Sequence, residues 1–270
     1  MQWKARDSVA VVTGASSGIG KCLTQLLADN GCHVIAIARR AEKINHWSAS
    51  DGSANFGAVT PLAGDITDEN VRNRVRSVID ANHSGKLDLL VNNAGVGGIG
   101  KFAEATTDRL RKIMEVNFFA PAELTRNLLP CLMLGKSPVI CNIGSVLGHR
   151  AVPDKSEYCA SKFAMHGWSD ALRAELFSTG IQVTLVSPST TRSEFFDSLI
   201  DTAPNQSSRS LGHWSAERVA DSAYSAIRKR RSEVILSLGG KALVYGDRVA
   251  PPLLNAILAQ RSPKTTDASD

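Results

Sequence analysis

Short runs of apolar, mostly β-branched residues alternate with longer amphipathic stretches along most of the 270-residue chain. Continuous apolar runs of this kind are typical of strands that are buried on both faces of a sheet. When such strands alternate with helices, the strands usually lie parallel and are joined by right-handed crossovers. The sequence therefore predicts an α/β fold, namely a single Rossmann-like doubly wound domain whose seven-stranded parallel sheet is flanked by helices.

The expected strands cover residues 9–13, 34–38, 58–62, 87–92, 139–143, 183–187 and 234–237, and the expected helices cover 20–30, 69–81, 107–134, 157–179 and 216–230. We expect residues 1–238 to form the domain. It includes a polar loop at 189–214, which is long enough to act as a lid over a site. Residues 239–270 are expected to be a C-terminal extension that packs on this chain or on a second subunit and frays at its end.

The composition disfavours several other classes of protein. The formal charge is +5, but lysines and arginines are scattered except at 228–231, so we expect no nucleic-acid partner. The five cysteines show no metal-ligand spacing, which predicts no metal site and a reducing, cytoplasmic location. No apolar run approaches the ~18 residues of a membrane-spanning helix, so we expect no membrane span.

A glycine-rich turn, Thr-Gly-Ala-Ser-Ser-Gly-Ile-Gly, follows the first expected strand. Glycines let the backbone turn tightly and approach a pyrophosphate, which then rests on the N-terminus of the next helix. The spacing is a variant of the usual dinucleotide fingerprint, and an ordinary glycine-rich turn is the alternative interpretation. The expected contacts are Gly14, Ser16, Ser17, Gly18, Ile19 and Gly20.

The second expected strand ends in two arginines, Arg39 and Arg40. An acidic residue at this position binds the ribose 2′-hydroxyl of NAD, whereas arginine accommodates the 2′-phosphate of NADP. Since no acidic residue occupies the strand end, we predict NADP(H) as the cofactor, with Arg39 as the main phosphate ligand and Arg40 as an auxiliary. Two solvated arginines are the alternative.

Tyr158 and Lys162 are four residues apart in a stretch expected to be helical, so their side chains share one face. A nearby ammonium favours the phenolate form of a tyrosine, and the pKa of a free phenol, ~10, is too high for efficient proton exchange at neutral pH. The pair therefore indicates a tyrosine that acts as a general acid or base. A half-buried aromatic beside a solvated lysine is the alternative.

Further short motifs occur in order along the chain. Gly64-Asp65-Ile66 follows the third expected strand, Asn92-Asn93-Ala94-Gly95 follows the fourth, Asn117 lies in the long expected helix, and Ser145 precedes Tyr158 by thirteen residues. With the glycine turn and the tyrosine–lysine pair, these motifs make the chain similar to the short-chain dehydrogenase/reductase family over roughly residues 8–237.

The resemblance implies a role for each motif. Tyr158 would exchange a proton with the substrate oxygen, and Lys162 would lower the pKa of Tyr158 and bind the nicotinamide ribose. Ser145 would hydrogen-bond the substrate oxygen, although a helix N-cap is the alternative, and Asn117 would hold a water through its backbone carbonyl. Cofactor contacts are implied at Asp65, Ile66, Asn93, Ala94, Gly95, Tyr158, Lys162, Pro188, Ser189 and Thr191.

One position departs from the family pattern, because Ser189 follows Pro188 where relatives commonly carry glycine. A serine there would be strained if the position required a positive φ. If it does not, the hydroxyl of Ser189 would lie near the carboxamide of the nicotinamide.

We therefore predict an NADP-dependent carbonyl reductase or alcohol dehydrogenase that acts on a fairly apolar small molecule. The expected apolar cover is supplied by Phe195, Phe196, Leu199, Ile200, Leu211 and Trp214 in the 189–214 loop, and these residues could instead anchor the loop. An epimerase or dehydratase, or a non-catalytic NADP(H)-binding regulator or scaffold, are the alternatives. We also expect a homodimer or homotetramer, in which residues 253–258 are partly buried.

Overall fold

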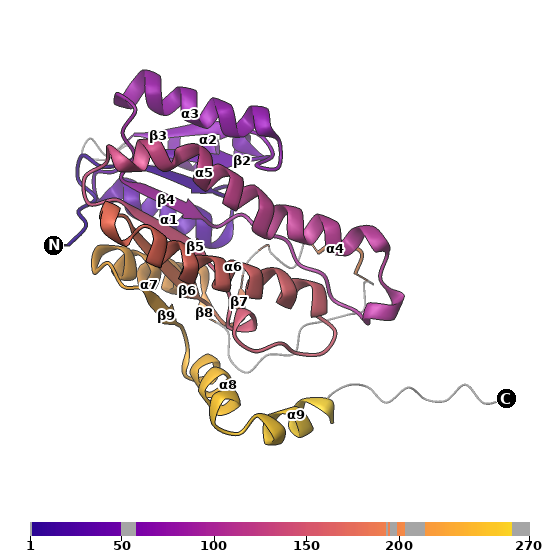
Figure 1. Cartoon of the computed structure of the whole chain (residues 1–270). Coiled ribbons are helices and arrows are strands. Elements are labelled where there is room, and N and C mark those ends of the chain that lie inside the picture. Colours follow the sequence, from indigo (N-terminus) through magenta and orange to yellow (C-terminus); the bar gives the residue numbers. More distant parts are fainter. Residues whose placement is uncertain (1, 50–57, 193, 195–198, 203–213, 261–270) are drawn as a thin grey trace.

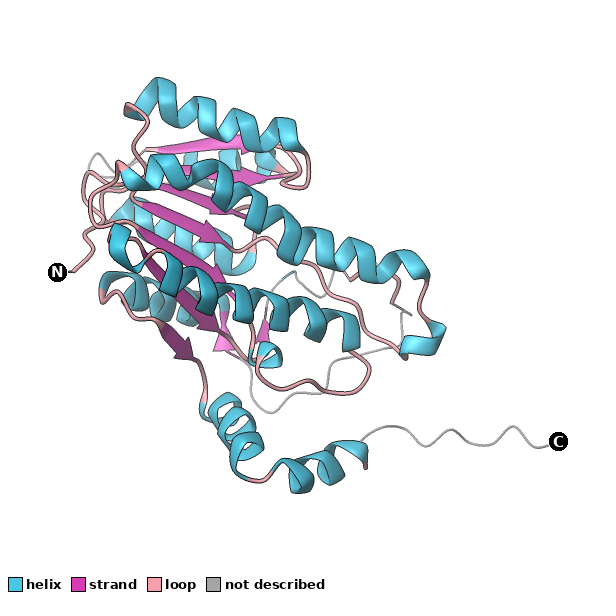
Figure 2. Ribbon diagram, viewed as in Figure 1, coloured by secondary structure: helices cyan, strands magenta, loops and turns pink. Residues whose placement is uncertain are grey.

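The computed structural model describes residues 2–49, 58–192, 194, 199–202 and 214–260. Seven parallel strands form the central sheet, in the order β3-β2-β1-β4-β5-β6-β9, and helices cover both faces (Figures 1 and 2). The predicted Rossmann-like α/β fold is therefore confirmed. A separate two-stranded ribbon pairs β7 with β8 at the base of the 189–214 loop.

The strands are β1 Val9–Thr13, β2 His33–Ala38, β3 Val59–Ala63, β4 Leu89–Asn92, β5 Val139–Ile143, β6 Gln182–Ser187, β7 Thr191–Arg192, β8 Trp214–Ser215 and β9 Glu233–Ile235. The helices are α1 Gly18–Asp29, α2 Ala41–Ala49, α3 Glu69–His83, α4 Thr107–Met114, α5 Ala120–Met133, α6 Ser156–Glu175, α7 Ala216–Arg228, α8 Leu238–Val249 and α9 Pro251–Ala259. Short helical turns are η1 Phe102–Glu104, η2 Glu115–Phe119, η3 Val146–Gly148 and η4 Phe177–Thr179.

Alternate side chains of each strand enter two separate layers of the core, which explains why the strands are apolar throughout. In β1, Ala10 and Val12 pack with α1, α2 and α7, whereas Val9 and Val11 pack with α3, α5 and α6. All five β1 residues are buried. A single charged residue on either face of this strand would therefore lose its contact with water.

The strand order reverses between β1 and β4, because β1 pairs with β2 on one side and with β4 on the other. Loops that leave the carboxyl ends of these two strands run in opposite directions and leave a crevice between them. This position brings together the glycine turn after β1 and the Asn-Asn-Ala-Gly segment after β4.

Two helical predictions were incomplete. The expected helix at 107–134 is divided into α4, a π-helical turn at Glu115–Phe119 and α5. A π-helical turn inserts an extra residue into the helix, and such turns frequently mark functional sites. The sequence analysis also missed α2, which is short and carries few apolar residues in its Ala-Glu-Lys-Ile-Asn-His sequence.

The C-terminal extension forms α8 and α9, which project from the body of the domain (Figure 1). Val244 of α8 is buried with Val146 and Ile235, so the extension packs on this chain next to η3. On α9, Leu253 is 63% exposed and Ile257 is 40% exposed. The predicted frayed end, residues 261–270, lies outside the described residues. Within the described part of the chain, no helix is long and apolar enough to cross a membrane.

Candidate active site

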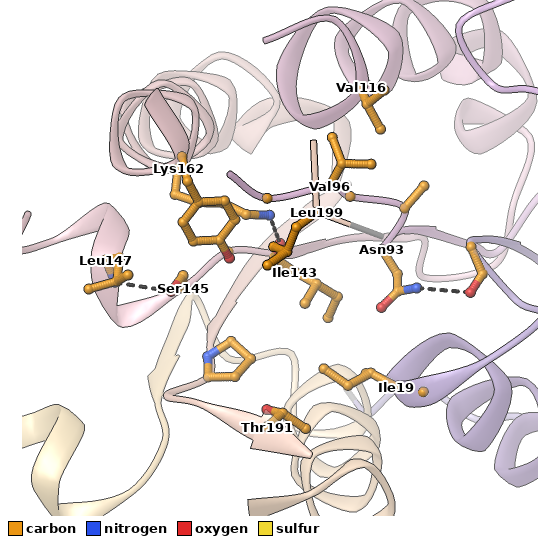
Figure 3. A pocket seen from close by; sticks show the side chains of 18 of the residues that line it. Ile19, Asn93, Val96, Val116, Ile143, Ser145, Leu147, Lys162, Thr191 and Leu199 are labelled. Carbon is orange, nitrogen blue, oxygen red and sulfur yellow. Dashed lines mark hydrogen bonds between the residues drawn. The ribbon is translucent and has the colours of Figure 1, made fainter. Parts of the chain in front are cut away.

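A cavity of ≈ 430 Å³ opens at the carboxyl ends of the strands (Figure 3). Its lining includes nearly all the predicted site residues, namely Gly14, Ser16, Ser17, Gly18, Ile19, Arg39, Arg40, Asp65, Ile66, Asn93, Ala94, Gly95, Ser145, Tyr158, Lys162, Pro188, Ser189 and Thr191. Among the predicted residues, Gly20 and Asn117 do not line it. The fold thus gathers segments from distant parts of the sequence around one space.

The glycine turn has the backbone that its sequence predicts. Gly14 and Gly18 have φ values of 68° and 53°, which a residue with a Cβ adopts only with strain. A Cβ on Gly14 would lie 2.9 Å from the Cα of Ala94, so the turn packs directly on the segment after β4. Gly20 is buried, and a Cβ there would overlap the Gly14 carbonyl oxygen. Gly20 therefore serves close packing of α1 on the turn, and its predicted cofactor contact stays a prediction.

Thr13 and Asn93 connect the two loops that flank the crevice. The Thr13 hydroxyl accepts hydrogen bonds from the backbone N–H groups of Asn93 and Ala94, both at 3.0 Å. The Asn93 amide donates to the carbonyl of Thr13 at 2.9 Å and to that of Gly14 at 3.3 Å. Asn93 therefore holds the turn in place, a role that the sequence analysis did not assign to it.

The two arginines after β2 differ in their surroundings. Both are exposed and both line the cavity. Arg40 forms an ion pair with Glu194 at 3.2 Å, and Lys43 pairs with the same carboxylate at 3.1 Å. Glu194 thus neutralises part of the charge of Arg40, which leaves Arg39 as the better phosphate ligand of the two.

The backbone of Ser189 is not strained in the way that a positive φ would have required. This residue does not have a positive φ, so a side chain at this position causes no backbone strain. Its carbonyl accepts a hydrogen bond of 3.2 Å from the Thr191 hydroxyl, which rigidifies the start of the 189–214 loop. Most of that loop, including the predicted cover residues Phe195, Phe196 and Leu211, lies outside the described residues.

Tyr158 and Ser145 meet at the inner end of the cavity. Burial raises the pKa of Tyr158 to about 12, and a hydrogen bond with the Ser145 side chain opposes this rise. This shift is opposite to the predicted lowering of the tyrosine pKa by Lys162, because the loss of hydration is its largest cause. Ser145 also accepts a hydrogen bond of 3.1 Å from the N–H of Leu147. It is therefore a cap of η3 as well as a site residue, and the two interpretations are compatible.

Lys162 lies one helical turn after Tyr158 and points toward the cavity (Figure 3). Its Nζ is 5.7 Å from the centre of the Tyr158 ring and donates a hydrogen bond of 3.0 Å to the Ile143 carbonyl. Burial lowers the pKa of this ammonium to about 8. The pKa of Lys162 therefore lies closer to neutrality than that of an ordinary lysine.

Asn117 is fully buried behind the cavity in the π-helical turn. Its amide oxygen accepts from the Val96 N–H at 2.8 Å, and its amide nitrogen donates to the Val96 carbonyl at 2.9 Å and to the Ser161 hydroxyl at 2.9 Å. The side chain thus joins the loop after β4 to α6, which carries Tyr158. The role of its backbone carbonyl in holding a water stays a prediction.

The sequence analysis did not predict the buried ion pair between Arg109 and Glu157, the residue before Tyr158. Arg109 binds Glu157 through two hydrogen bonds of 3.0 Å, and each side chain is 3% exposed. Burial raises the pKa of Glu157, but the hydrogen bonds from Arg109 outweigh it, so the pKa lies below its ordinary value. Arg109 also donates to the Asp201 carbonyl at 3.1 Å, which connects α4, α6 and the 189–214 loop.

Two apolar side chains of the C-terminal extension, Leu243 and Leu258, also line the cavity. Leu258 belongs to the apolar run at 253–258, which by itself does not indicate what it packs on, and the sequence analysis did not single out Leu243. From the 189–214 loop, Leu199 lines the cavity, whereas Trp214 packs against the core and under the Arg218 guanidinium at 3.9 Å. Of the predicted cover residues that the structure describes, Leu199 is therefore part of the cavity wall and Trp214 anchors the loop.

The geometry fits an oxidoreductase site of the dinucleotide-binding type, with Tyr158, Ser145 and Lys162 in the same cavity as the glycine turn. Comparison with known proteins identifies the family. The model of the short chain dehydrogenase family matches residues 8–203, and the chain belongs to that family. The predicted family membership is confirmed, as is an NAD(P)-dependent oxidoreductase that acts on CH–OH or carbonyl groups.

The individual relatives described next are 26–34% identical to this chain. Rat "Dehydrogenase/reductase SDR family member 7B" is 30% identical over 96% of this chain and 82% of its own length. A "3-ketodihydrosphingosine reductase" of Bacteroides thetaiotaomicron is 34% identical over 71% of this chain and 67% of its own length. Among solved structures, a Burkholderia cenocepacia short chain dehydrogenase in complex with NADP has a TM-score of 0.79 and 26% identity, and the match covers 95% of this chain and 99% of that one.

Proposed function

We propose that this protein is an NADPH-dependent reductase of an apolar ketone or aldehyde. The observation that carries the proposal is the arrangement of one cavity. Tyr158, Ser145 and Lys162 converge at its inner end, the glycine turn and Arg39 line its other end, and aliphatic side chains complete the wall.

The residues that line the cavity fit NADP(H). The glycine turn leads into the N-terminus of α1, where backbone N–H groups can stabilise a pyrophosphate. Arg39 is exposed at the cavity wall, beyond the end of β2, and can bind a 2′-phosphate. The solved relative from Burkholderia cenocepacia, which is bound to NADP, supports the same cofactor.

The proton chemistry favours reduction. With its pKa raised to about 12, Tyr158 stays a neutral phenol at physiological pH and can donate its proton to a substrate carbonyl oxygen. Ser145 supplies a second hydrogen-bond donor to the same oxygen, so the developing alkoxide meets two donors. Lys162, with a pKa of about 8, can then return a proton to Tyr158. When bound, NADPH supplies the hydride.

The cavity wall beyond the catalytic groups indicates an apolar substrate. It is formed by the aliphatic side chains of Val96, Ile99, Leu147, Val152, Leu199, Leu243 and Leu258. These side chains come from four separate segments of the chain, so a substrate must touch several of them at once. The relative named "3-ketodihydrosphingosine reductase" supports a ketone on an alkyl chain as the substrate class.

A series of methyl ketones of increasing alkyl length tests this proposal. Each added methylene should raise kcat/KM about 4-fold until the apolar wall is covered, because burying one CH₂ contributes about 0.8 kcal/mol. Consumption of NADPH is followed by the absorbance of the reduced nicotinamide, with keto acids of matched length as the control series. A rate that is independent of alkyl length would contradict the apolar site, and no NADPH consumption with any carbonyl compound would contradict a reductase.

The cofactor assignment makes a separate prediction at Arg39. Replacing Arg39 by alanine should weaken NADPH binding about 10- to 100-fold, since hydrogen bonds to a charged group contribute about 1.5–3 kcal/mol. NADH binding should change little, because NADH has no 2′-phosphate. Nicotinamide fluorescence titrations of both cofactors measure the difference, and Arg126→Ala on the exposed face of α5 is the matched control. Equal losses for NADPH and NADH would refute the phosphate contact.

The alternatives have less support. Tyr158, Ser145 and Lys162 all line one cavity. A non-catalytic regulator would not need this combination of a phenol, a hydroxyl and an ammonium. An epimerase or dehydratase on this fold stays an alternative that the ketone series would exclude by stoichiometric NADPH consumption.

A cytoplasmic homodimer or homotetramer stays part of the proposal, and the exposed side chains of α9 are the surface that a second subunit would cover.

A further inference from the structure

Two histidines and a glutamate from separate elements meet outside the catalytic cavity. His149 directly follows η3, His166 lies on α6, and Glu233 begins β9. One potential ligand atom from each residue lies within 4.8 Å of those of the other two. Imidazole nitrogens and carboxylate oxygens are common zinc ligands in proteins.

One distance within this cluster matches that of a tetrahedral zinc site, and a second is somewhat longer. Zinc–nitrogen and zinc–oxygen bonds of about 2.0–2.1 Å place neighbouring ligand atoms about 3.3 Å apart in a tetrahedron. His149 Nε2 lies 3.2 Å from Glu233 Oε1, and His166 Nε2 lies 3.9 Å from the same oxygen. His166 Nε2 also lies 3.4 Å from Asp170 Oδ2, one turn further along α6. Of these three described residues, Asp170 lies near His166 alone and is outside their group, so a water would complete the four ligands of the ion.

The hydrogen bonds of His166 orient its ring as in known zinc sites. Its Nδ1 lies 3.1 Å from the carbonyl oxygen of Gly148. A carbonyl oxygen only accepts, so Nδ1 must carry the proton, and the neutral ring then has its lone pair on Nε2. Metal-binding histidines typically donate their other ring N–H to a carbonyl in this way. The lone pair of His166 faces two carboxylates, and only a cation or a further proton makes that arrangement favourable.

His149 is the buried member of the cluster, because its side chain is only 1% exposed. Among the described residues its Nδ1 has no hydrogen-bond partner, so the polar contacts of this ring are made through Nε2. That nitrogen faces Glu233 and lies 2.9 Å from the Ser187 hydroxyl. The rings of His149 and His166 are 4.2 Å apart between centroids. The buried ring of His149 therefore directs Nε2, its one nitrogen with polar contacts to described residues, toward the Glu233 carboxylate that His166 also faces.

Two carboxylates, Asp170 and Glu233, lie on the solvent side of the cluster. Arg173 donates to the Oδ1 atom of Asp170 at 2.7 Å, which leaves Oδ2 directed at His166. The side chains of Asp170 and Glu233 are 54% and 35% exposed, so an ion can enter from the surface. We propose that His149, His166 and Glu233 form a binding site for one zinc ion, with a water as the fourth ligand.

Such an ion would connect the catalytic segments to the edge of the sheet. His149 is four residues after Ser145, and His166 is four residues after Lys162. Glu233 belongs to β9, the last strand of the sheet. The site would therefore fix the segment after β5 and helix α6 to β9, and it is a structural site because it lies outside the cavity.

The proposal is tested with Co²⁺ and Zn²⁺ on the full-length, metal-stripped protein. Co²⁺ should bind at one ion per chain and give the intense visible absorption of a tetrahedral ion, and Zn²⁺ should displace it. Zn²⁺ should also raise the melting temperature, because an ion that binds only the folded state stabilises it. No stoichiometric binding, or the weak spectrum of a six-coordinate Co²⁺ ion, would overturn the proposal.

Matched variants separate this site from adventitious binding. His166→Gln and Glu233→Gln should each weaken Co²⁺ binding by about 100-fold or more, since changes in the groups that merely orient metal ligands cost 10- to 100-fold. His83→Gln, which removes a histidine that pairs with His33 on another face, should bind as the wild type does. Each variant's melting temperature without metal shows whether it folds. Equal Co²⁺ affinity in all three variants would also overturn the proposal.

Discussion

Replacing Tyr158 by phenylalanine should lower kcat for ketone reduction about 10²- to 10⁴-fold, while NADPH binds with nearly unchanged affinity. The phenol is the group that donates a proton to the carbonyl oxygen, and general acid catalysis typically contributes that factor. The aromatic ring remains, so the shape of the cavity is preserved. Stopped-flow or steady-state NADPH consumption measures kcat, and a fluorescence titration measures the affinity for NADPH.

Two further variants locate the effect at this hydroxyl. Tyr245→Phe on α8, where the side chain is 51% exposed, should leave kcat unchanged. Ser145→Ala should lower kcat about 10²-fold, because it removes a hydrogen-bond donor to the developing alkoxide. If Tyr158→Phe retained wild-type turnover, another group would have to supply the proton and the proposed mechanism would be wrong.

Breaking the buried Arg109–Glu157 pair should lower the free energy of unfolding by about 3–5 kcal/mol, because one charge would be left buried without its partner. In a chain of this size that corresponds to a decrease of about 5–15 °C in melting temperature. The variant Glu157→Gln tests this by calorimetry or denaturant unfolding. Removing both charges with Arg109→Met and Glu157→Leu should recover much of the loss, since an apolar pair carries no desolvation cost.

The exposed pair Arg76–Asp80 on α3 is the matched control for the buried one. It also joins one arginine to one carboxylate through two contacts, at 3.1 and 3.0 Å. Because its side chains are 35% and 50% exposed, Asp80→Asn should cost less than about 1 kcal/mol. A loss at Glu157→Gln that is as small as this would show that the buried pair contributes little.

The same pair predicts how stability depends on pH. The pKa of Glu157 is lower in the folded protein than its ordinary value of 4.5. The unfolded chain therefore takes up a proton first as the pH falls. The contribution of Glu157 is fully present above pH 4.5 and is lost as the pH falls through the folded-state pKa. The difference in melting temperature between wild type and Glu157→Gln should narrow over that range.

Features that depend on residues close in sequence were predictable. Tyr158 and Lys162 share a helix face because they are four residues apart, and the structure places both at the cavity. The positive φ values of Gly14 and Gly18 follow from a residue type that has no Cβ. The cofactor end of the cavity could therefore be assigned from one turn and one strand end.

Features that depend on burial were not predictable in the same way. The pKa of Tyr158 was expected to be lowered by Lys162, but burial raises it to about 12. Spacing shows which charges are near, whereas the loss of water around a group depends on every segment that packs over it. Likewise, nothing in the sequence paired Arg109 with Glu157, because the two residues belong to different helices that meet only after folding.

The sequence by itself determined the class of fold and most of the strand-to-helix order, and it predicted the catalytic and cofactor residues that line the cavity, since each of these depends on local periodicity or a short motif. The tertiary structure alone decided what surrounds them. It made Leu243 and Leu258 of the C-terminal extension part of the cavity wall, and it brought His149, His166 and Glu233 within reach of a single ion. The physical reason is that desolvation and ligand geometry depend on contacts between distant segments, and those contacts exist only once the sheet and its helices have packed.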